Sequence, residues 1–465
     1  MSGPNEASGA RVLDVDRSRL PPVGPVRPFH FPPVQKSILA NGLPCWTVSH
    51  TSIPVVTVTL LIRRGSSDDP PGKEGLAALT VDMLDEGSGS RSAIEMHEAL
   101  ARIGAQLDSD IGPDATQLTV TVLSRFTADA LKLLADMVVR PSLHDADVSR
   151  VRQLRLHRLT QLRDMPGAVA DRMFMRLLYG SHPYGHTPLG SEQALTAMTV
   201  GDVRGFHDSG VRPSEATLMV VGDCDHAEVE RLSARAFEGW SGTAAPRPPS
   251  TSPLPAPPPL NIVPRAGAPQ SELRIGHVAV ARSTPDYHAL VAANMVLGGQ
   301  FVSRINLNLR EEKGLTYGAR TAFDFRRLPG PFALHVSVHT GATAHAVEES
   351  LDEIDAIRGR RPITPQELAL GLAALTRGYA RNFETAEQIA RAVSQIALYD
   401  LPDDYFAQFV PRIERLTPDE VMGVARRHLD PDRLTTLVVG DLDQIGPQLQ
   451  RSRLSAPVVL SAELF

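Results

Sequence analysis

The stretch Thr199–Asp225 reads TVGDVRGFHDSGVRPSEATLMVVGDCD, and a related stretch, Thr417–Asp443, reads TPDEVMGVARRHLDPDRLTTLVVGDLD. They align without a gap at a constant offset of 218 residues, and the identical pairs include Thr199/Thr417, Val203/Val421, Pro213/Pro431, Thr217/Thr435, Val220/Val438, Val221/Val439, Gly222/Gly440, Asp223/Asp441 and Asp225/Asp443. Each copy reads as a helix, a turn at proline and a buried strand that ends in Gly-Asp. Such a repeat predicts two halves that share one fold by duplication.

Two proline-rich stretches divide the chain. Residues 1–33 are polar and then punctuated by prolines, which favours an extended arm with little helix or sheet. From Pro246 to Pro259, eight of fourteen residues are proline, and because each proline fixes its φ angle this linker is expected to be stiff. We therefore expect an arm over 1–33, a first domain over 34–245, a linker over 246–260 and a second domain over 261–465.

Within each half, strand and helix patterns alternate. Val55–Ile62 is rich in β-branched residues, and Gln117–Leu123 and Phe332–His339 alternate between apolar and polar residues as half-buried strands do. Ser92 opens a capping box for a helix that Gly104 closes. These patterns predict an α+β fold of two duplicated domains, each a mostly antiparallel sheet packed with helices on one side.

The composition is that of a globular protein, with 465 residues, 42% hydrophobic, 22% charged and a net charge of −6. Without a long basic run, no nucleic-acid partner is expected. The longest apolar run, Ile53–Ile62, is too short to span a membrane, and the first residues lack the apolar core of a signal peptide. We expect a cytoplasmic location, or a periplasmic one if a leader was removed. Cys45 and Cys224 imply no disulfide framework, although one bridge between them stays open.

The segment Arg310–Tyr317, REEKGLTY, resembles the Arg-(six residues)-Tyr element of the insulinase/pitrilysin metallopeptidases, also called inverzincins. The preceding run Val296–Arg304 resembles the Gly-rich turn before that element. The resemblance implies half of a clam-shell peptidase, in which Arg310 and Tyr317 hydrogen-bond substrate carbonyl oxygens and the oxyanion at the scissile bond. The alternative is that Arg310 is an exposed helix residue paired with a neighbouring glutamate and Tyr317 is a core residue at a strand start.

Members of that family also carry a zinc motif, His-x-x-Glu-His, on an early helix. The matching helix here is Gly75–Met83, and Ala78, Val81 and Asp82 stand at the positions of His, Glu and His. Residues 78 and 82 lie one turn apart on the same side of a helix, so that two histidines there could share one zinc. Ala78 and Val81 have no donor atoms, and Asp82 alone supplies one ligand at most.

The resemblance also implies a third ligand, a glutamate, on a helix that we equate with Val148–Arg163. That stretch has no Asp or Glu and contains five arginines, at positions 150, 152, 155, 158 and 163. Their charge would repel a cation. We therefore predict that this chain holds no zinc and has no metal-ligating residues of its own.

Two histidine pairs could suggest another metal site. His182 and His186 have a spacing of four, but the intervening Pro183 and Gly185 favour a loop, which is similar to a structural turn of the family. His335 and His339 share a strand face but lie about 13 Å apart at a rise of about 3.3 Å per residue, too far for one ion. Neither pair supports a self-contained peptidase with a different metal site.

The leading hypothesis is a zinc-less subunit of a heterodimeric insulinase-like peptidase. A homologous partner with an intact His-x-x-Glu-His motif would supply zinc and the general base, and this chain would present Arg310 and Tyr317 to a peptide substrate. The alternative is a non-enzymatic scaffold or peptide-binding subunit, similar to the core proteins of respiratory complexes. Asp108-Ser109 favours the alternative, because active members carry Asn-Ala near the strand that holds substrate.

Overall fold

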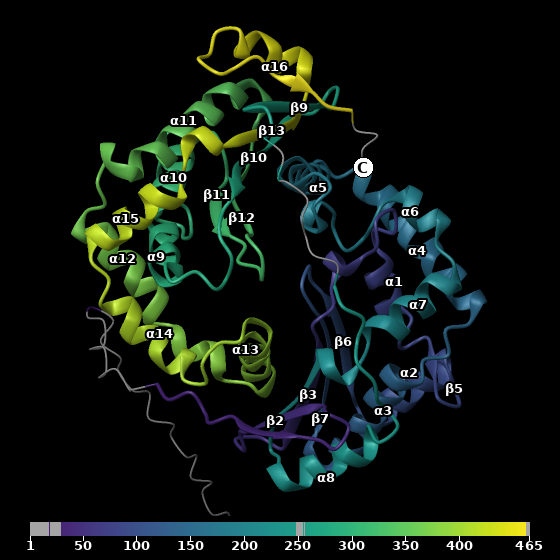
Figure 1. Cartoon of the computed structure of the whole chain (residues 1–465). Coiled ribbons are helices and arrows are strands. Elements are labelled where there is room, and N and C mark those ends of the chain that lie inside the picture. The colour runs from purple at the N-terminus through teal and green to yellow at the C-terminus, as the bar shows by residue number, and fades with distance from the viewer. Residues whose placement is uncertain (1–17, 19–28, 248–253, 255, 462–465) are drawn as a thin grey trace, which may run out of the picture. The chain divides into compact units, whose positions relative to one another are not determined.

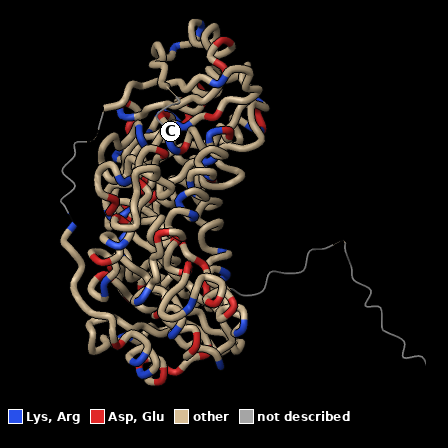
Figure 2. The backbone as a smooth tube through the Cα atoms, turned by 90° about the vertical axis from the view of Figure 1, so that its right-hand side faces the viewer, with Lys and Arg blue, Asp and Glu red and all other residues tan. Residues whose placement is uncertain are grey.

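A computed structural model describes Ser18, residues 29–247, Leu254 and residues 256–461. It separates Met1–His30 from Phe31–Phe465, and everything below concerns the second of these units. The expected arm over 1–33 and the centre of the expected linker fall largely outside the described residues, so the domain limits stay predictions. Figure 2 shows acidic and basic residues interspersed along the chain, which agrees with the lack of a long basic run. No described helix is long and apolar enough to cross a membrane.

The first half forms a mixed sheet with the order β1-β2-β8-β3-β7-β6. Figure 1 labels β2, β3, β6 and β7 of this sheet. Its strands are β1 (Gln35–Ile38), β2 (Pro44–Ser49), β3 (Val55–Ile62), β6 (Gln106–Ile111), β7 (Thr116–Leu123) and β8 (Ala216–Gly222). Only β2 and β8 run parallel. The predicted strand over 55–62 is therefore confirmed, and the one over 117–123 is confirmed to within a residue.

The second half forms a corresponding sheet with the order β11-β12-β10-β13-β9-β14. Its strands are β9 (Leu260–Pro264), β10 (Gln270–Val278), β11 (Ala319–Phe323), β12 (Pro331–His339), β13 (Thr435–Gly440) and β14 (Val458–Val459). β9 runs parallel to both β13 and β14, and the other pairs are antiparallel. The prediction of mostly antiparallel sheets holds, with parallel pairs in both.

Helices surround both sheets. In the first half they are α1 (Leu76–Asp82), α2 (Ala93–Arg102), α3 (Thr127–Val139), α4 (Asp145–Arg163), α5 (Pro166–Tyr179), α6 (Glu192–Ala197), α7 (Val200–Gly210) and α8 (His226–Ala236), with a short hairpin of β4 (Gly87–Ser88) and β5 (Arg91–Ser92). In the second half they are α9 (Tyr287–Leu297), α10 (Arg304–Asn306), α11 (Thr343–Asp355), α12 (Pro365–Thr376), α13 (Ala386–Tyr399), α14 (Tyr405–Glu414), α15 (Pro418–His428) and α16 (Leu442–Leu449). Short 3-10 or π-helical turns lie at 66–68, 124–126, 183–185, 213–215, 307–312, 340–342, 356–360, 379–383 and 431–433.

The duplicated stretches adopt equivalent structures. α7 and α15 each begin at a threonine, Thr199 or Thr417, whose hydroxyl caps the helix in a capping box. Short turns at Pro213 and Pro431 then lead into β8 and β13, every residue of which is buried. The repeat in the sequence is thus a repeat of one helix–turn–strand unit at the centre of each sheet.

The two halves exchange one helix. α5, from the first half, packs on β10 and β13, whereas α13, from the second half, packs on β3 and β8. Helices α3 and α8 contact the first sheet within their own half, and the apolar core on the second sheet includes residues of α9, α11 and α15. The central strands of each sheet are therefore covered on both faces, which explains why β3 is apolar or β-branched throughout its length. The prediction of helices on one side only is wrong, because the second cover comes from a helix of the other half.

Candidate functional site

The early helix α1 lies where the family resemblance expects a metal site. Its N-terminus is held by the buried carboxylate of Asp69, which accepts hydrogen bonds from the backbone amides of Gly75 (2.7 Å) and Ala77 (2.6 Å). His186 Nε2 donates to the same carboxylate at 3.0 Å. Burial raises the pKa of Asp69, although its hydrogen bonds act in the opposite direction. The His182–His186 turn thus anchors α1, as expected for a structural turn.

The three positions that match the zinc motif hold no metal-binding group. Ala78 and Val81 are buried in the core and have no donor atoms. Asp82 is bound by an arginine: Arg155 Nη1, on α4, lies 2.5 Å from Asp82 Oδ2, and Arg155 Nη2 donates to the carbonyl of Pro188 at 2.7 Å. The Arg155 guanidinium therefore lies between α1 and α4, the two helices that the resemblance implies carry the zinc ligands. Its positive charge opposes the binding of a dication there.

Helix α4 begins at Asp145, three residues before the predicted start, so its first turn contains Asp145 and Asp147. Asp147 lies 3.5 Å from Arg150 and is two turns away from Arg155, so it does not replace the missing ligand. Among the residues that the structure describes, no three His, Cys, Asp or Glu side chains are grouped so as to hold a metal ion. The residues at this position do not fit zinc, and the expectation of no zinc stays open to measurement.

The other histidine and cysteine candidates form neither a metal-binding group nor a disulfide among the described residues. His182 accepts a hydrogen bond from the Tyr184 amide through Nδ1, and Pro183–Gly185 forms a 3-10 turn. His339 is exposed and caps the short turn after β12. Cys45 and Cys224 are free thiols, so the bridge left open by the sequence is not formed.

The Arg–Tyr element lies on a π-helical turn and the loop before β11. Asn306 fixes this region, because its Nδ2 donates to the Phe301 carbonyl (2.8 Å) and its Oδ1 accepts from the Ala319 amide (3.0 Å). Gly298 approaches β11 so closely that a Cβ there would lie 2.4 Å from Thr321 Oγ1. Packing therefore requires glycine at position 298, and the Asn306 bond to the Ala319 amide joins the turn that carries Arg310 to the strand that follows Tyr317.

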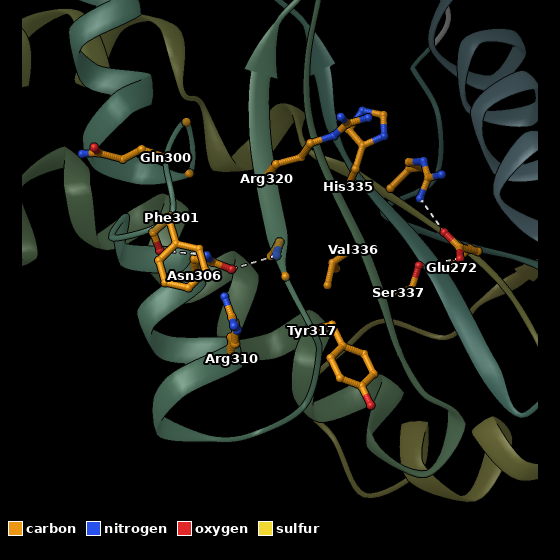
Figure 3. Close-up of a pocket in the computed structure, with 15 residues that line it drawn as sticks. Glu272, Gln300, Phe301, Asn306, Arg310, Tyr317, Arg320, His335, Val336 and Ser337 are labelled. Carbon is orange, nitrogen blue, oxygen red and sulfur yellow. Dashed lines mark hydrogen bonds and ion pairs between the residues drawn. The ribbon is translucent and has the colours of Figure 1, made fainter. Parts of the chain in front are cut away.

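Arg310 and Tyr317 line one cavity of about 570 Å³ (Figure 3). The Arg310 guanidinium lies 4.2 Å from the Phe301 ring centroid, and its Nε is 3.4 Å from Glu311, which is the neighbour pairing of the alternative interpretation. Tyr317 is 93% exposed, so the interpretation as a core residue is wrong. No hydrogen bond joins the two side chains, both of which lie in the described part of the chain, and both phenol and guanidinium can reach a ligand.

A charged network that the sequence analysis did not identify lines the opposite side of this cavity. Glu272 Oε2 accepts from Arg274 (3.1 Å) and Glu272 Oε1 accepts from Ser337 Oγ (2.5 Å). Arg274 also donates to Asp171 on α5 at 2.6 Å, and His335 Nδ1 lies 3.5 Å from Asp171. Burial favours a higher pKa for Asp171, but the hydrogen bonds from His335 and Arg274 outweigh it and lower the pKa.

This network had one signal in the sequence. Glu272 and Arg274 alternate with Ser271, Leu273 and Ile275 along β10, all three of them buried, so their side chains share the face opposite the core. The strands that pair with β10 determine which side chains Glu272 and Arg274 contact. The register opposes Glu272 to Ser337 and Arg274 to His335, and this pairing could not be read from local patterns.

Comparison with known proteins identifies the family. The family described as Insulinase (Peptidase family M16) matches residues 46–191, and that described as Peptidase M16 inactive domain matches residues 197–375. This chain belongs to the insulinase/pitrilysin (M16) family. It is 23% identical over 401 residues to an uncharacterized zinc protease of Streptomyces coelicolor, covering 84% of this chain and 86% of that protein. It is 25% identical over 411 residues to one of Mycobacterium tuberculosis, covering 87% and 93%.

Two solved structures share the fold. One is the peptidase M16 inactive domain from Pseudomonas fluorescens, with a TM-score of 0.79 at 24% identity, covering 88% of this chain and 98% of the other. The second is a protease from Helicobacter pylori, with a TM-score of 0.81 at 20% identity, covering 88% and 99%. The predicted fold is confirmed by these likenesses.

Proposed function

We propose that this chain is the zinc-less subunit of a two-chain insulinase-type peptidase. A homologous partner with an intact zinc motif supplies the metal and the general base. This chain supplies Arg310 and Tyr317 to bind the peptide and stabilise the tetrahedral intermediate. The observation that carries the proposal is that Arg310 and Tyr317 share an open cavity while the metal positions of α1 hold Ala78, Val81 and an ion-paired Asp82.

The chemistry of the cavity suits a developing oxyanion. A guanidinium keeps its charge at any physiological pH and offers several donors in a fixed plane, and a phenol adds a neutral donor. Thr316 holds the backbone next to Tyr317, since its Oγ1 donates to the Ser337 carbonyl (2.7 Å) and accepts from the Gly318 amide (3.1 Å). The exposed Tyr317 ring therefore projects from a fixed backbone, which favours a role toward a ligand over a role in packing.

A second candidate function is a non-enzymatic scaffold or peptide-binding subunit. It is favoured by Asp108-Ser109, which replaces the Asn-Ala of active members and lies on β6, an exposed edge strand of the first sheet. The pairing of Arg310 with its own neighbour Glu311 is in line with the same reading. In this case the cavity binds a peptide without taking part in its cleavage.

Reconstitution separates the two functions. The chain is combined with a homologous subunit that carries an intact motif, and peptidase activity is measured for the wild type, Arg310→Ala and Tyr317→Phe. Loss of an oxyanion donor typically lowers kcat on the order of 10²–10³-fold, and we expect such losses while the two chains still co-elute. Arg377→Gln, a change at an exposed arginine outside the cavity, is the matched control. Full activity of both variants in an assembled complex would leave only the scaffold function.

A further inference from the structure

One charged side chain of the Arg310–Tyr317 cavity has no counterion among the residues that the structure describes. Arg320 lies on β11, opposite His335 on β12, and Figure 3 shows its side chain extending across toward His335. It is exposed, lines the cavity and forms no ion pair with any residue in the described parts of the chain. A cation on a cavity wall without a carboxylate partner is available to a ligand.

The carboxylates on the opposite side of the cavity already have partners within the protein. Glu272 accepts from both Ser337 and Arg274, and Asp171 accepts from Arg274 and lies beside His335. The Arg274 side chain is only 6% exposed, whereas the Asp171 carboxylate with which it pairs is 56% exposed. The cluster contains two carboxylates and one guanidinium, but among the described residues neither carboxylate forms an ion pair with Arg320.

The second cation of the cavity, Arg310, is only weakly neutralised. Its partner Glu311 is 3.4 Å away and 51% exposed, and an ion pair of that kind contributes little in water. The Arg310 guanidinium is instead positioned by the ring of Phe301. Two guanidinium groups, Arg310 and Arg320, therefore face one cavity with spare hydrogen-bond donors, and the fork of donors on a guanidinium matches the two oxygens of a carboxylate.

We infer that this cavity selects peptides that carry a carboxylate, and that Arg320 is the residue that recognises it. The inference rests on the proposed peptide-binding function and adds a substrate class to it. Arg310 and Tyr317 contact the peptide backbone, and Arg320, on the neighbouring strand, pairs with an acidic group of the same peptide. The acidic group is either the side chain of Asp or Glu or the free carboxyl terminus, which provide the same chemistry.

Peptide binding to the purified full-length chain tests the inference. Short dansyl-labelled peptides that differ only in one central residue, Glu, Gln or Lys, are compared by fluorescence anisotropy, each with a free and with an amidated C-terminus. We expect the Kd of the Glu peptide or of the free-carboxyl peptide to be roughly tenfold lower than that of the neutral amidated one. If the central residue changes the Kd, the carboxylate is that of a side chain; if amidation changes it, the carboxylate is the free C-terminus.

Variants assign the preference to Arg320. Arg320→Gln should abolish the tenfold difference, and Arg320→Glu should reverse it in favour of the Lys peptide. Arg377→Gln, which removes an exposed arginine that lies outside the cavity and has no ion pair among the described residues, should leave the difference unchanged. Circular dichroism shows whether each variant is folded.

Two results would overturn the inference. Equal binding of the Glu, Gln and Lys peptides, with no difference between free and amidated C-termini and with binding lost in Arg310→Ala, would reject the acidic preference while leaving the proposed peptide site intact. Absence of any peptide binding by the folded chain would reject it as well. In that case the reconstitution assay decides the proposed function separately, because it measures cleavage by the assembled pair.

Discussion

The guanidinium of Arg155 and the carboxylate of Asp82 form an ion pair at 2.5 Å that joins α4 to α1. These are the two helices from which the family resemblance expects zinc ligands. The guanidinium supplies a positive charge fixed to the protein, and its second nitrogen also binds the Pro188 carbonyl. A fixed cation at this point both connects the helices and opposes a metal ion.

The purified chain should therefore contain no stoichiometric zinc. Ala78 and Val81 provide no ligand, and the one carboxylate of the matched motif is bound to Arg155. Elemental analysis after dialysis against metal-free buffer measures this, with a mutant lacking any tag histidines as the control. Zinc that remains bound at about one ion per chain would contradict the interpretation of α1 as a degenerate metal helix.

Removing the ion pair should loosen the contact between α1 and α4. Asp82 is 41% exposed, so much of the interaction is screened, and we expect Arg155→Ala to lower the free energy of unfolding by about 1 kcal/mol. A double-mutant cycle with Asp82→Ala should give a coupling energy of about 0.5–1 kcal/mol in chemical denaturation. Arg158→Ala, at an exposed arginine of the same helix, should change stability little, and an equal loss there would show that the Asp82 ion pair is not responsible, since alanine itself favours a helix.

Much of the fold could be predicted from local patterns. Strand β3 has the predicted limits, 55–62, and α2 opens with the Ser92–Glu95 capping box and is followed by Gly104 with φ of +64°. These features depend on residues close together in the sequence, because side-chain periodicity and capping act over one or two turns. Because the two halves share a repeated sequence, the helix, turn and strand predicted for one half could also be predicted for the other.

The contacts that define the site could not be predicted in the same way. Arg155 meets Asp82 across 73 residues of sequence, and Arg274 meets Asp171 across 103. Both contacts depend on helix packing, and the second exists because α5 lies on the sheet of the other half. Hydrophobic periodicity shows that α5 is amphipathic, but it does not indicate which sheet the helix covers.

Stability should fall in acid because of Glu367, which binds the Gly-rich turn. Arg304, the last residue of that turn, donates to both oxygens of Glu367 on α12, at 2.7 and 2.8 Å. Burial favours a higher pKa for Glu367, but the Arg304 hydrogen bonds outweigh it and lower the pKa from 4.5 to about 2. A carboxyl whose pKa is lower in the folded protein stabilises it above the unfolded pKa, and that contribution is lost as the pH falls from about 4.5 to about 2.

Glu367→Gln measures this contribution. Because Glu367 is one-third exposed, we expect a loss of about 1–2 kcal/mol in the free energy of unfolding at neutral pH, shrinking toward pH 2. Denaturant titrations at a series of pH values compare it with Glu414→Gln, at an exposed glutamate without an ion pair in the described chain. A constant difference between wild type and Glu367→Gln over the whole pH range would show that the carboxylate charge is not responsible.

Restoring the zinc motif alone should not restore a peptidase. The triple change Ala78→His, Val81→Glu and Asp82→His puts two imidazoles and a general base on α1, but positions 78 and 81 are buried and packed, so the larger side chains are strained. The change also removes the partner of Arg155, whose unpaired charge then lies beside the new imidazoles. We expect weak zinc binding at most in isothermal titration and no cleavage of a fluorogenic peptide panel.

Adding Arg155→Glu to the triple change is the matched comparison. It removes the opposing charge and offers a carboxylate from α4 in its place, so zinc should bind more tightly than to the triple variant, since catalytic zinc sites use three protein ligands. Equal zinc affinity of the two variants would show that Arg155 does not control the site. Chelator-sensitive turnover by the triple variant alone would show that the rest of an active peptidase is intact, and that this chain is a silenced enzyme rather than one subunit of a pair.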